Sequence, residues 1–113
     1  MQEAIKMDAL TELRNLMGDA LNEVLQTFID YMPGQIDELT QAISNDNPEN
    51  VFNLAHKLKS SSSSIGALGL AQVAQEIELI GRSGTTEGTA ELLEQLKGLY
   101  AGAETVLQEE LKK

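Results

Sequence analysis

The chain contains a single histidine, and the residues around it are the best candidates for chemistry. His56 lies in the segment AHKLKSSSSSIGALGL (residues 55–70), next to Lys57, Lys59 and five consecutive serines. Imidazole can carry chemistry near neutral pH, but a lone histidine on a helix is more often structural or simply solvated. The first question is whether this segment is a flexible linker or an ordered surface built around His56.

The apolar residues on either side of the serines favour a helix over a linker. Leu58 and Ile65 are seven residues apart, which is two helical turns. The apolar stripe that begins at Val51 therefore resumes at Ile65 only if the serines are helical, although serine is a poorer helix former than alanine by about 0.5 kcal/mol. In that helix Ser62 faces the core.

A second stripe lies beside the core-facing one when each residue is rotated by about 100°. Its members are neighbours on one outer face because they are spaced three, four or seven apart: Phe52, His56, Lys59, Ser60 and Ser63. The hydroxyls are too small to obstruct a large partner whose reactive atom must reach the imidazole. We therefore expect an ordered, accessible histidine.

Charge is unevenly distributed along the chain. The net charge is −10, yet residues 50–75 contain no Asp or Glu, where the overall composition predicts about four. The strong negative charge argues against nucleic acid and anionic lipid as partners, because both require clustered positive charge. A protein or a small molecule remains as the partner.

Composition also excludes several kinds of site. The absence of cysteine excludes disulfides, zinc–thiolate sites, iron–sulfur clusters and cysteine nucleophiles. No apolar run approaches the roughly 20 residues of a membrane-spanning helix, and the first residues lack the pattern of a signal peptide. We therefore expect a cytoplasmic protein.

Helical periodicity throughout, with no alternating strand pattern, predicts an all-α fold. We expect an antiparallel up-and-down four-helix bundle preceded by a short helix that begins near Asp8 and stops at Gly18. The long second helix starts after Asp19 and is kinked near Pro33, with two collinear helices as the alternative.

Local signals place the remaining elements. Asn47-Pro48-Glu49 starts the helix that carries His56, and Gly66 ends it. Another helix follows, then a loop over residues 81–88, then a last helix from about Thr89 to Leu111. Residues 1–113 are predicted to form a single domain whose residues 1–7 are flexible.

The region from residue 55 to residue 78 resembles the histidine-containing phosphotransfer (HPt) domains of bacterial multistep phosphorelays. The family motif reads approximately A-H-x-L-K-G-S-S, then G-A, a Leu, and a terminal L-E or L-Q pair. This chain has AHKLKSSS, Gly66-Ala67, Leu70 and Ile77-Glu78. It departs from the motif at Ser60, where the family usually has a glycine that allows close approach of a partner.

The resemblance implies a role for each residue of the site. His56 is the phosphoacceptor, attacking through Nε2 while an acceptor holds Nδ1–H. Glu78 is the residue that orients the imidazole, and Lys59 stabilises charge on the phosphoryl group. The residues expected to contact the partner are Phe52, Lys57, Ser60 and Ser63.

The resemblance also implies the partners. They are receiver domains of response regulators, which hold the Mg²⁺, with a hybrid sensor histidine kinase as a further candidate. The chain itself is then a monomeric phosphocarrier with no cofactor, metal site or kinase activity. Met1 and the complete set of helices favour a free-standing protein.

Two other classes of function remain to be weighed. A non-phosphorylated interaction module would use the face of Phe52, His56 and Ser60 for docking alone. A histidine-nucleophile enzyme, such as a phosphatase or a metal-dependent hydrolase, is less favoured, because one histidine cannot be both nucleophile and separate proton donor. Glu78 is also a poor metal ligand without companions.

Overall fold

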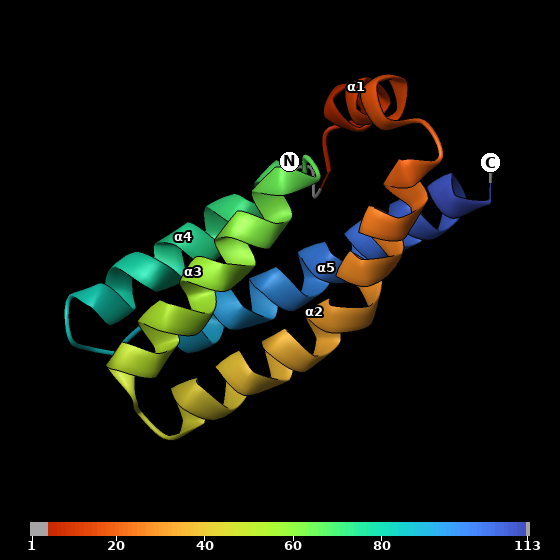
Figure 1. Ribbon diagram of the computed structural model, residues 1–113. Coiled ribbons are helices and arrows are strands. Elements are labelled where there is room, and N and C mark those ends of the chain that lie inside the picture. The colour runs from red at the N-terminus through yellow and green to blue at the C-terminus, as the bar shows by residue number, and fades with distance from the viewer. Residues whose placement is uncertain (1–4, 113) are drawn as a thin grey trace.

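The computed structural model describes residues 5–112 and consists there of helices without any strand (Figure 1). The five helices, in chain order, are α1 (Met7–Met17), α2 (Ala20–Ser44), α3 (Pro48–Ser64), α4 (Leu68–Arg82) and α5 (Thr89–Leu111). Contacts between α2 and α3, α3 and α4, α4 and α5, and α5 and α2 close a ring of antiparallel neighbours. This is the predicted up-and-down four-helix bundle, and α1 lies across one end of it.

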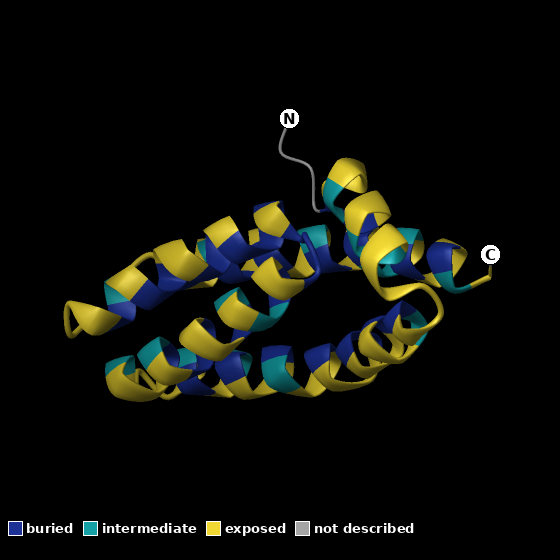
Figure 2. Ribbon diagram, turned by 45° about the horizontal axis from the view of Figure 1, so that its top comes forward, coloured by how far each residue is buried: buried dark blue, intermediate teal, exposed yellow. Residues whose placement is uncertain are grey.

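One apolar stripe from each long helix forms the core. Leu25, Leu58, Ile77 and Leu96 come from α2, α3, α4 and α5 in turn, and all four are fully buried. Figure 2 shows the buried faces turned towards the inside of the bundle and the exposed faces towards solvent. The core therefore follows the helical periodicity of the sequence.

Helix α2 is continuous through Pro33, so the alternative of two collinear helices is wrong. Figure 1 shows α2 bent along its length. Pro33 has no amide hydrogen, which leaves the carbonyl of Ile29 without its partner one turn later. The Tyr100 hydroxyl from α5 donates to this carbonyl at 3.3 Å. Burial, followed by a hydrogen bond to Glu104 and the negative charge of that residue, raises the pKa of Tyr100 far above its ordinary value, so the hydroxyl keeps the single proton for which Glu104 and the Ile29 carbonyl compete.

The N-terminus of α3 has the predicted cap. The Asn47 side chain accepts a hydrogen bond from the Asn50 amide at 3.2 Å, and Pro48 occupies the first turn. The helix then runs through all five serines to Ser64, which confirms that they are helical rather than a linker. Ser62 is fully buried, and its hydroxyl has no hydrogen-bond partner.

The structure corrects two of the expected boundaries. Ile5 is buried, the Lys6 amide donates to the Gly66 carbonyl at 3.0 Å, and Met7 begins α1, so contacts with the bundle begin at Ile5, inside the segment expected to be flexible. Residues 1–4 lie outside the described part of the chain. Helix α4 continues through Gly81 and Arg82, so the connecting loop covers only residues 83–88, because Gly81 packs against α3.

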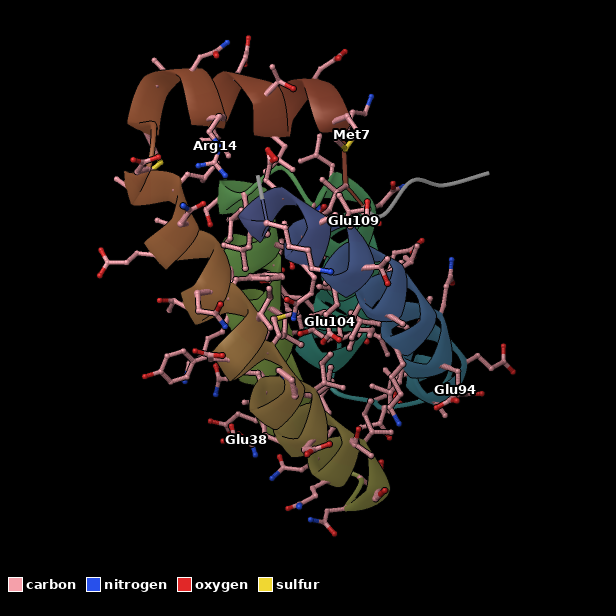
Figure 3. All side chains as sticks on the ribbon, turned by 90° about the vertical axis from the view of Figure 1, so that its right-hand side faces the viewer. Met7, Arg14, Glu38, Glu94, Glu104 and Glu109 are labelled. Carbon is pink, nitrogen blue, oxygen red and sulfur yellow. The ribbon has the colours of Figure 1, made fainter. Side chains whose placement is uncertain are left out.

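Helix α1 is fastened to the end of the bundle by both apolar and polar contacts. Leu10 is fully buried. Arg14 extends from α1 towards the bundle (Figure 3) and donates to the Gly18 carbonyl and the Asn22 side chain, both at 2.9 Å. It also lies 3.8 Å from Glu110 of α5. These contacts join the short first helix to α2 and α5.

Candidate functional site

The candidate site lies between α3 and α4, where two residues distant in the sequence meet. His56 Nδ1 is 2.8 Å from Glu78 Oε2. A carboxylate can only accept a hydrogen bond, so Nδ1 carries the proton and donates, and Nε2 of the neutral ring keeps the lone pair. The His56 side chain is 57% exposed, whereas that of Glu78 is 9% exposed. A buried acceptor therefore holds an accessible imidazole.

Glu78 has a second partner on α3. Lys59 Nζ lies 2.7 Å from Glu78 Oε1, so the two carboxylate oxygens hold one group each. Burial raises the pKa of Glu78, but the Lys59 ammonium and the His56 ring lower it by more, and the net pKa lies below its ordinary value. Glu78 is consequently ionised at neutral pH. The ammonium of Lys59, which the resemblance assigned to a phosphoryl group, pairs with Glu78 in the structure.

Phe52 lies one helical turn before His56 and packs against it. The two ring centroids are 6.3 Å apart and the ring planes differ by 29°, a stacked arrangement. Ser60 and Ser63 are exposed on the same side of α3. The structure thus brings Phe52, Lys59, Ser60 and Ser63 around His56, as the sequence pattern predicted.

Lys57 lies on the opposite flank of α3. It lines a shallow hollow against α2, together with Tyr31, Gln35 and Glu38. The structure therefore does not bring Lys57 together with the His56–Glu78 pair, because a step of one residue rotates the side chain by about 100° around the helix.

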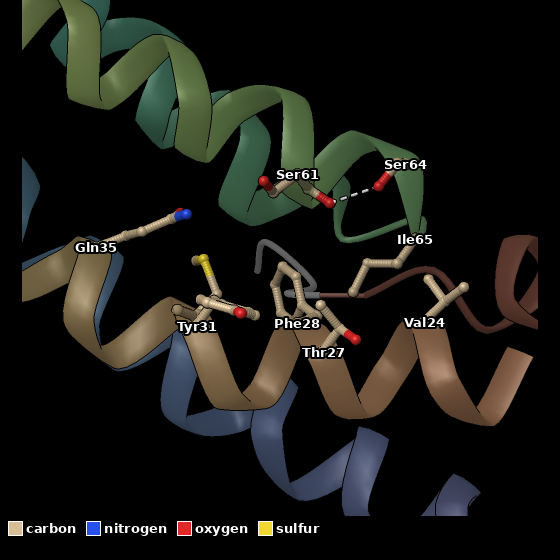
Figure 4. Close-up of a pocket in the computed structure, with 9 residues that line it drawn as sticks. Val24, Thr27, Phe28, Tyr31, Gln35, Ser61, Ser64 and Ile65 are labelled. Carbon is tan, nitrogen blue, oxygen red and sulfur yellow. Dashed lines mark hydrogen bonds between the residues drawn. The ribbon is translucent and has the colours of Figure 1, made fainter.

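The same flank carries a groove that sequence reasoning missed (Figure 4). It has a volume of about 240 Å³ and is lined by Val24, Thr27, Phe28, Tyr31, Met32 and Gln35 of α2, with Ser61, Ser64 and Ile65 opposite. The Tyr31 ring is 67% exposed, and Gln35 Oε1 is buried without a hydrogen-bond partner. The sequence feature that could have revealed this groove is Tyr31, an aromatic residue at a solvent-facing position of α2.

Among residues 5–112, no three His, Asp or Glu side chains lie close enough together to bind a metal ion. None of the described helices is both long and apolar enough to cross a membrane.

An antiparallel bundle that presents one exposed imidazole, held at Nδ1 by a buried carboxylate, defines the class of histidine phosphotransfer domains. The Hpt domain profile matches residues 23–106, and the chain belongs to this family. It is a phosphorelay intermediate, an all-α phosphocarrier domain of the two-component signalling class.

Known proteins of the family resemble the chain along nearly its whole length. Histidine-containing phosphotransfer protein B (HptB) of Pseudomonas aeruginosa PAO1 is 25% identical, with a TM-score of 0.91 over 96% of this chain and 95% of HptB. The HPT domain of a sensor hybrid histidine kinase from Shewanella shares the fold, with 18% identity and a TM-score of 0.79 over 96% of this chain and 94% of that domain.

The curated relatives are much longer proteins. The signal transduction histidine-protein kinases BarA of Shigella flexneri and of Escherichia coli K12 are each 29% identical over 108 residues, 89% of this chain. The chain spans only 12% of the length of BarA. The likeness therefore concerns one region of those kinases.

Proposed function

We propose that His56 is the phosphoacceptor of this domain, taking the phosphoryl group from a receiver aspartate and passing it to another. The hydrogen bond between His56 Nδ1 and Glu78 is the observation that carries the proposal. It leaves the lone pair on Nε2 of a side chain that is more than half exposed. The nucleophilic nitrogen is therefore available to a large partner.

The transfer balances without an added proton. The Nε2 lone pair forms the bond to phosphorus, and the bond from phosphorus to the aspartyl oxygen breaks, its electron pair returning to the receiver carboxylate. The ring then carries a positive charge, which the ionised Glu78 at Nδ1 stabilises. Reversal of the same step passes the phosphoryl group on.

Lys59 supports the phosphorylated state in this proposal. Its ammonium is held at Glu78 Oε1, next to the imidazole, and the transferring group carries negative charge on its equatorial oxygens. Movement of the ammonium from the carboxylate to those oxygens would stabilise both the transition state and the product. The carboxylate keeps the imidazole as its remaining partner.

Receiver domains are the proposed partners, including that of a hybrid sensor kinase. The receiver supplies Mg²⁺, and this chain supplies the nucleophile and its orientation, so no cofactor, metal site or enzymatic turnover is assigned to this chain alone. Phe52, Ser60 and Ser63 form the contact surface around His56. A monomeric state, a single domain and a cytoplasmic location belong to the same proposal.

Transfer of radiolabelled phosphate tests the proposal. Receiver domains from the source genome, phosphorylated with labelled acetyl phosphate, are mixed with wild-type protein, His56→Gln or the surface control Gly98→Ala on α5. Wild type and control should gain acid-labile label, and His56→Gln should gain none. Label on His56→Gln would overturn the proposal, and receiver binding without any transfer would select a docking module instead.

Replacement of Glu78 tests the orienting role separately. Glu78→Ala leaves His56 without its Nδ1 acceptor, so transfer should slow by roughly tenfold while circular dichroism still shows a folded bundle. A transfer rate equal to that of the wild type would refute the role of Glu78.

A further inference from the structure

Gly81 marks the closest approach of α4 to α3. It is buried within α4, and a Cβ placed on it would lie 2.8 Å from both Phe52 N and Pro48 O, which belong to the backbone of the first five residues of α3. Carbon atoms ordinarily keep contacts of about 3.5 Å or more. Only a residue without a side chain therefore allows the two helices to approach this closely.

Three helical glycines, Gly34, Gly98 and Gly102, lack such a neighbour. Gly98 and Gly102 of α5 are exposed, and a Cβ on either would meet no atom within 4 Å. The contact at Gly81 is thus a property of that position. Sequence reasoning placed Gly81 in a loop because glycine usually ends a helix.

The contact lies one turn away from the candidate site. Gly81 follows Glu78 by three residues, and Phe52 precedes His56 by four. At about 1.5 Å of rise per residue, the two levels are roughly 5 Å apart along the antiparallel pair. A change in the distance between α3 and α4 at Gly81 therefore also changes their distance at the His56–Glu78 hydrogen bond, one helical turn away.

We propose that Gly81 is a positioning residue that brings Glu78 within reach of His56. The inference rests on the proposed function only for the importance of that hydrogen bond. Gly81→Ala must move the backbone of α4 away from that of α3, by up to about 0.7 Å to restore ordinary contact. The same movement would lengthen the 2.8 Å bond towards a limit of about 3.5 Å, which is beyond good hydrogen-bond geometry.

The ring tautomer of His56 provides a test that needs no partner. Nitrogen NMR of the labelled protein should show the Nδ1–H tautomer in wild type and a larger Nε2–H fraction in Gly81→Ala. Phosphorylation of His56 by phosphoramidate should slow by roughly three- to tenfold, the effect of losing one hydrogen bond. Gly98→Ala and Gly102→Ala are the matched controls and should change neither reading.

A double-mutant cycle separates positioning from general structure. If Gly81 acts through Glu78, Gly81→Ala should cause no further loss of rate in a Glu78→Ala background. An equal loss in both backgrounds would overturn the inference, as would a folded Gly81→Ala protein with the wild-type tautomer. A wild-type protein that phosphoramidate never labels would contradict the proposed function, while the tautomer still decides the role of Gly81.

A stabilised background guards against unfolding of the Gly81→Ala protein. Gly98→Ala and Gly102→Ala both raise helix propensity at open positions, so Gly81→Ala is made together with them. If that protein still does not fold, a measurement on the wild-type protein tests the inference. The close approach predicts nuclear Overhauser contacts between Gly81 Hα and the Phe52 amide proton, and their absence would overturn the inference.

Discussion

Glu78 combines burial with two polar partners, one at each oxygen. Its side chain is 9% exposed, and its oxygens lie 2.8 Å from His56 and 2.7 Å from Lys59. A buried carboxylate without partners would bind a proton, whereas this one stays ionised because a cation and an N–H group both face it. The same arrangement orients the imidazole and keeps a lysine close to it.

The lowered pKa of Glu78 predicts a dependence of stability on pH. A carboxylate whose folded pKa is lowered contributes stability above its ordinary pKa, and this contribution is lost as the pH falls through the folded value. Wild type should exceed Glu78→Gln by about 1–3 kcal/mol at pH 7. Urea denaturation from pH 7 to pH 3 should show the gap narrowing as the pH falls below about 4.5, and a gap of the same size at both ends of this range would contradict this explanation.

Ser62 should be replaceable with a gain in stability. Its hydroxyl is fully buried without a hydrogen-bond partner, which costs about 1–3 kcal/mol. Ser62→Ala should therefore raise the free energy of unfolding by more than Ser63→Ala, an exposed control on the same helix that gains only about 0.5 kcal/mol of helix propensity. Equal gains in urea titrations would show that the Ser62 hydroxyl is satisfied in solution.

At the scale of elements, α5 compensates for the proline in α2. Pro33 removes the amide that would bond the Ile29 carbonyl, and Tyr100 supplies a hydroxyl from the neighbouring helix. The bend of α2 and its contact with α5 therefore depend on each other. The exposed Tyr31 and the groove beside α3 lie on the other side of α2.

A double-mutant cycle measures this compensation. Tyr100→Phe should lower the free energy of unfolding by about 1 kcal/mol, because the buried Ile29 carbonyl loses its donor. In a Pro33→Ala background the loss should be smaller, since the restored amide bonds the same carbonyl. Equal losses in the two backgrounds, measured by urea denaturation, would show that the two groups do not share that acceptor.

At the scale of the whole molecule, α1 and the site occupy separable parts of the bundle. Gly66 has φ of +80°, and a Cβ on it would lie 2.7 Å from the Ala9 Cβ. The turn after α3 therefore accommodates α1 through a glycine, and His56 lies more than two turns away along α3.

Gly66→Ala should destabilise the protein without disturbing the site. A left-handed conformation costs an alanine about 1–2 kcal/mol, and the contact with Ala9 adds to this cost. Thermal unfolding should shift to lower temperature, while the nitrogen NMR signals of His56 should remain those of the wild type. A changed tautomer would show that α1 and the site are coupled.

Much of the architecture could be predicted because helical periodicity is a local property. The spacing from Leu58 to Ile65 indicated a helical serine run, and the structure confirms it. The stripe of Phe52, His56, Lys59, Ser60 and Ser63 follows from the same rotation per residue. The meeting of His56 with Glu78 is also observed, although its role in phosphotransfer stays a proposal.

The sequence by itself thus determined the helices, their buried faces and the accessible histidine. Only the tertiary structure decided that Lys59 rests on Glu78, that Tyr100 bonds the carbonyl freed by Pro33, and that Gly81 sets the approach of α4 to α3. A helix repeats by its own hydrogen bonds, so its pattern is written in consecutive residues. The distance between two helices depends instead on side chains from both, which no single stretch of sequence contains.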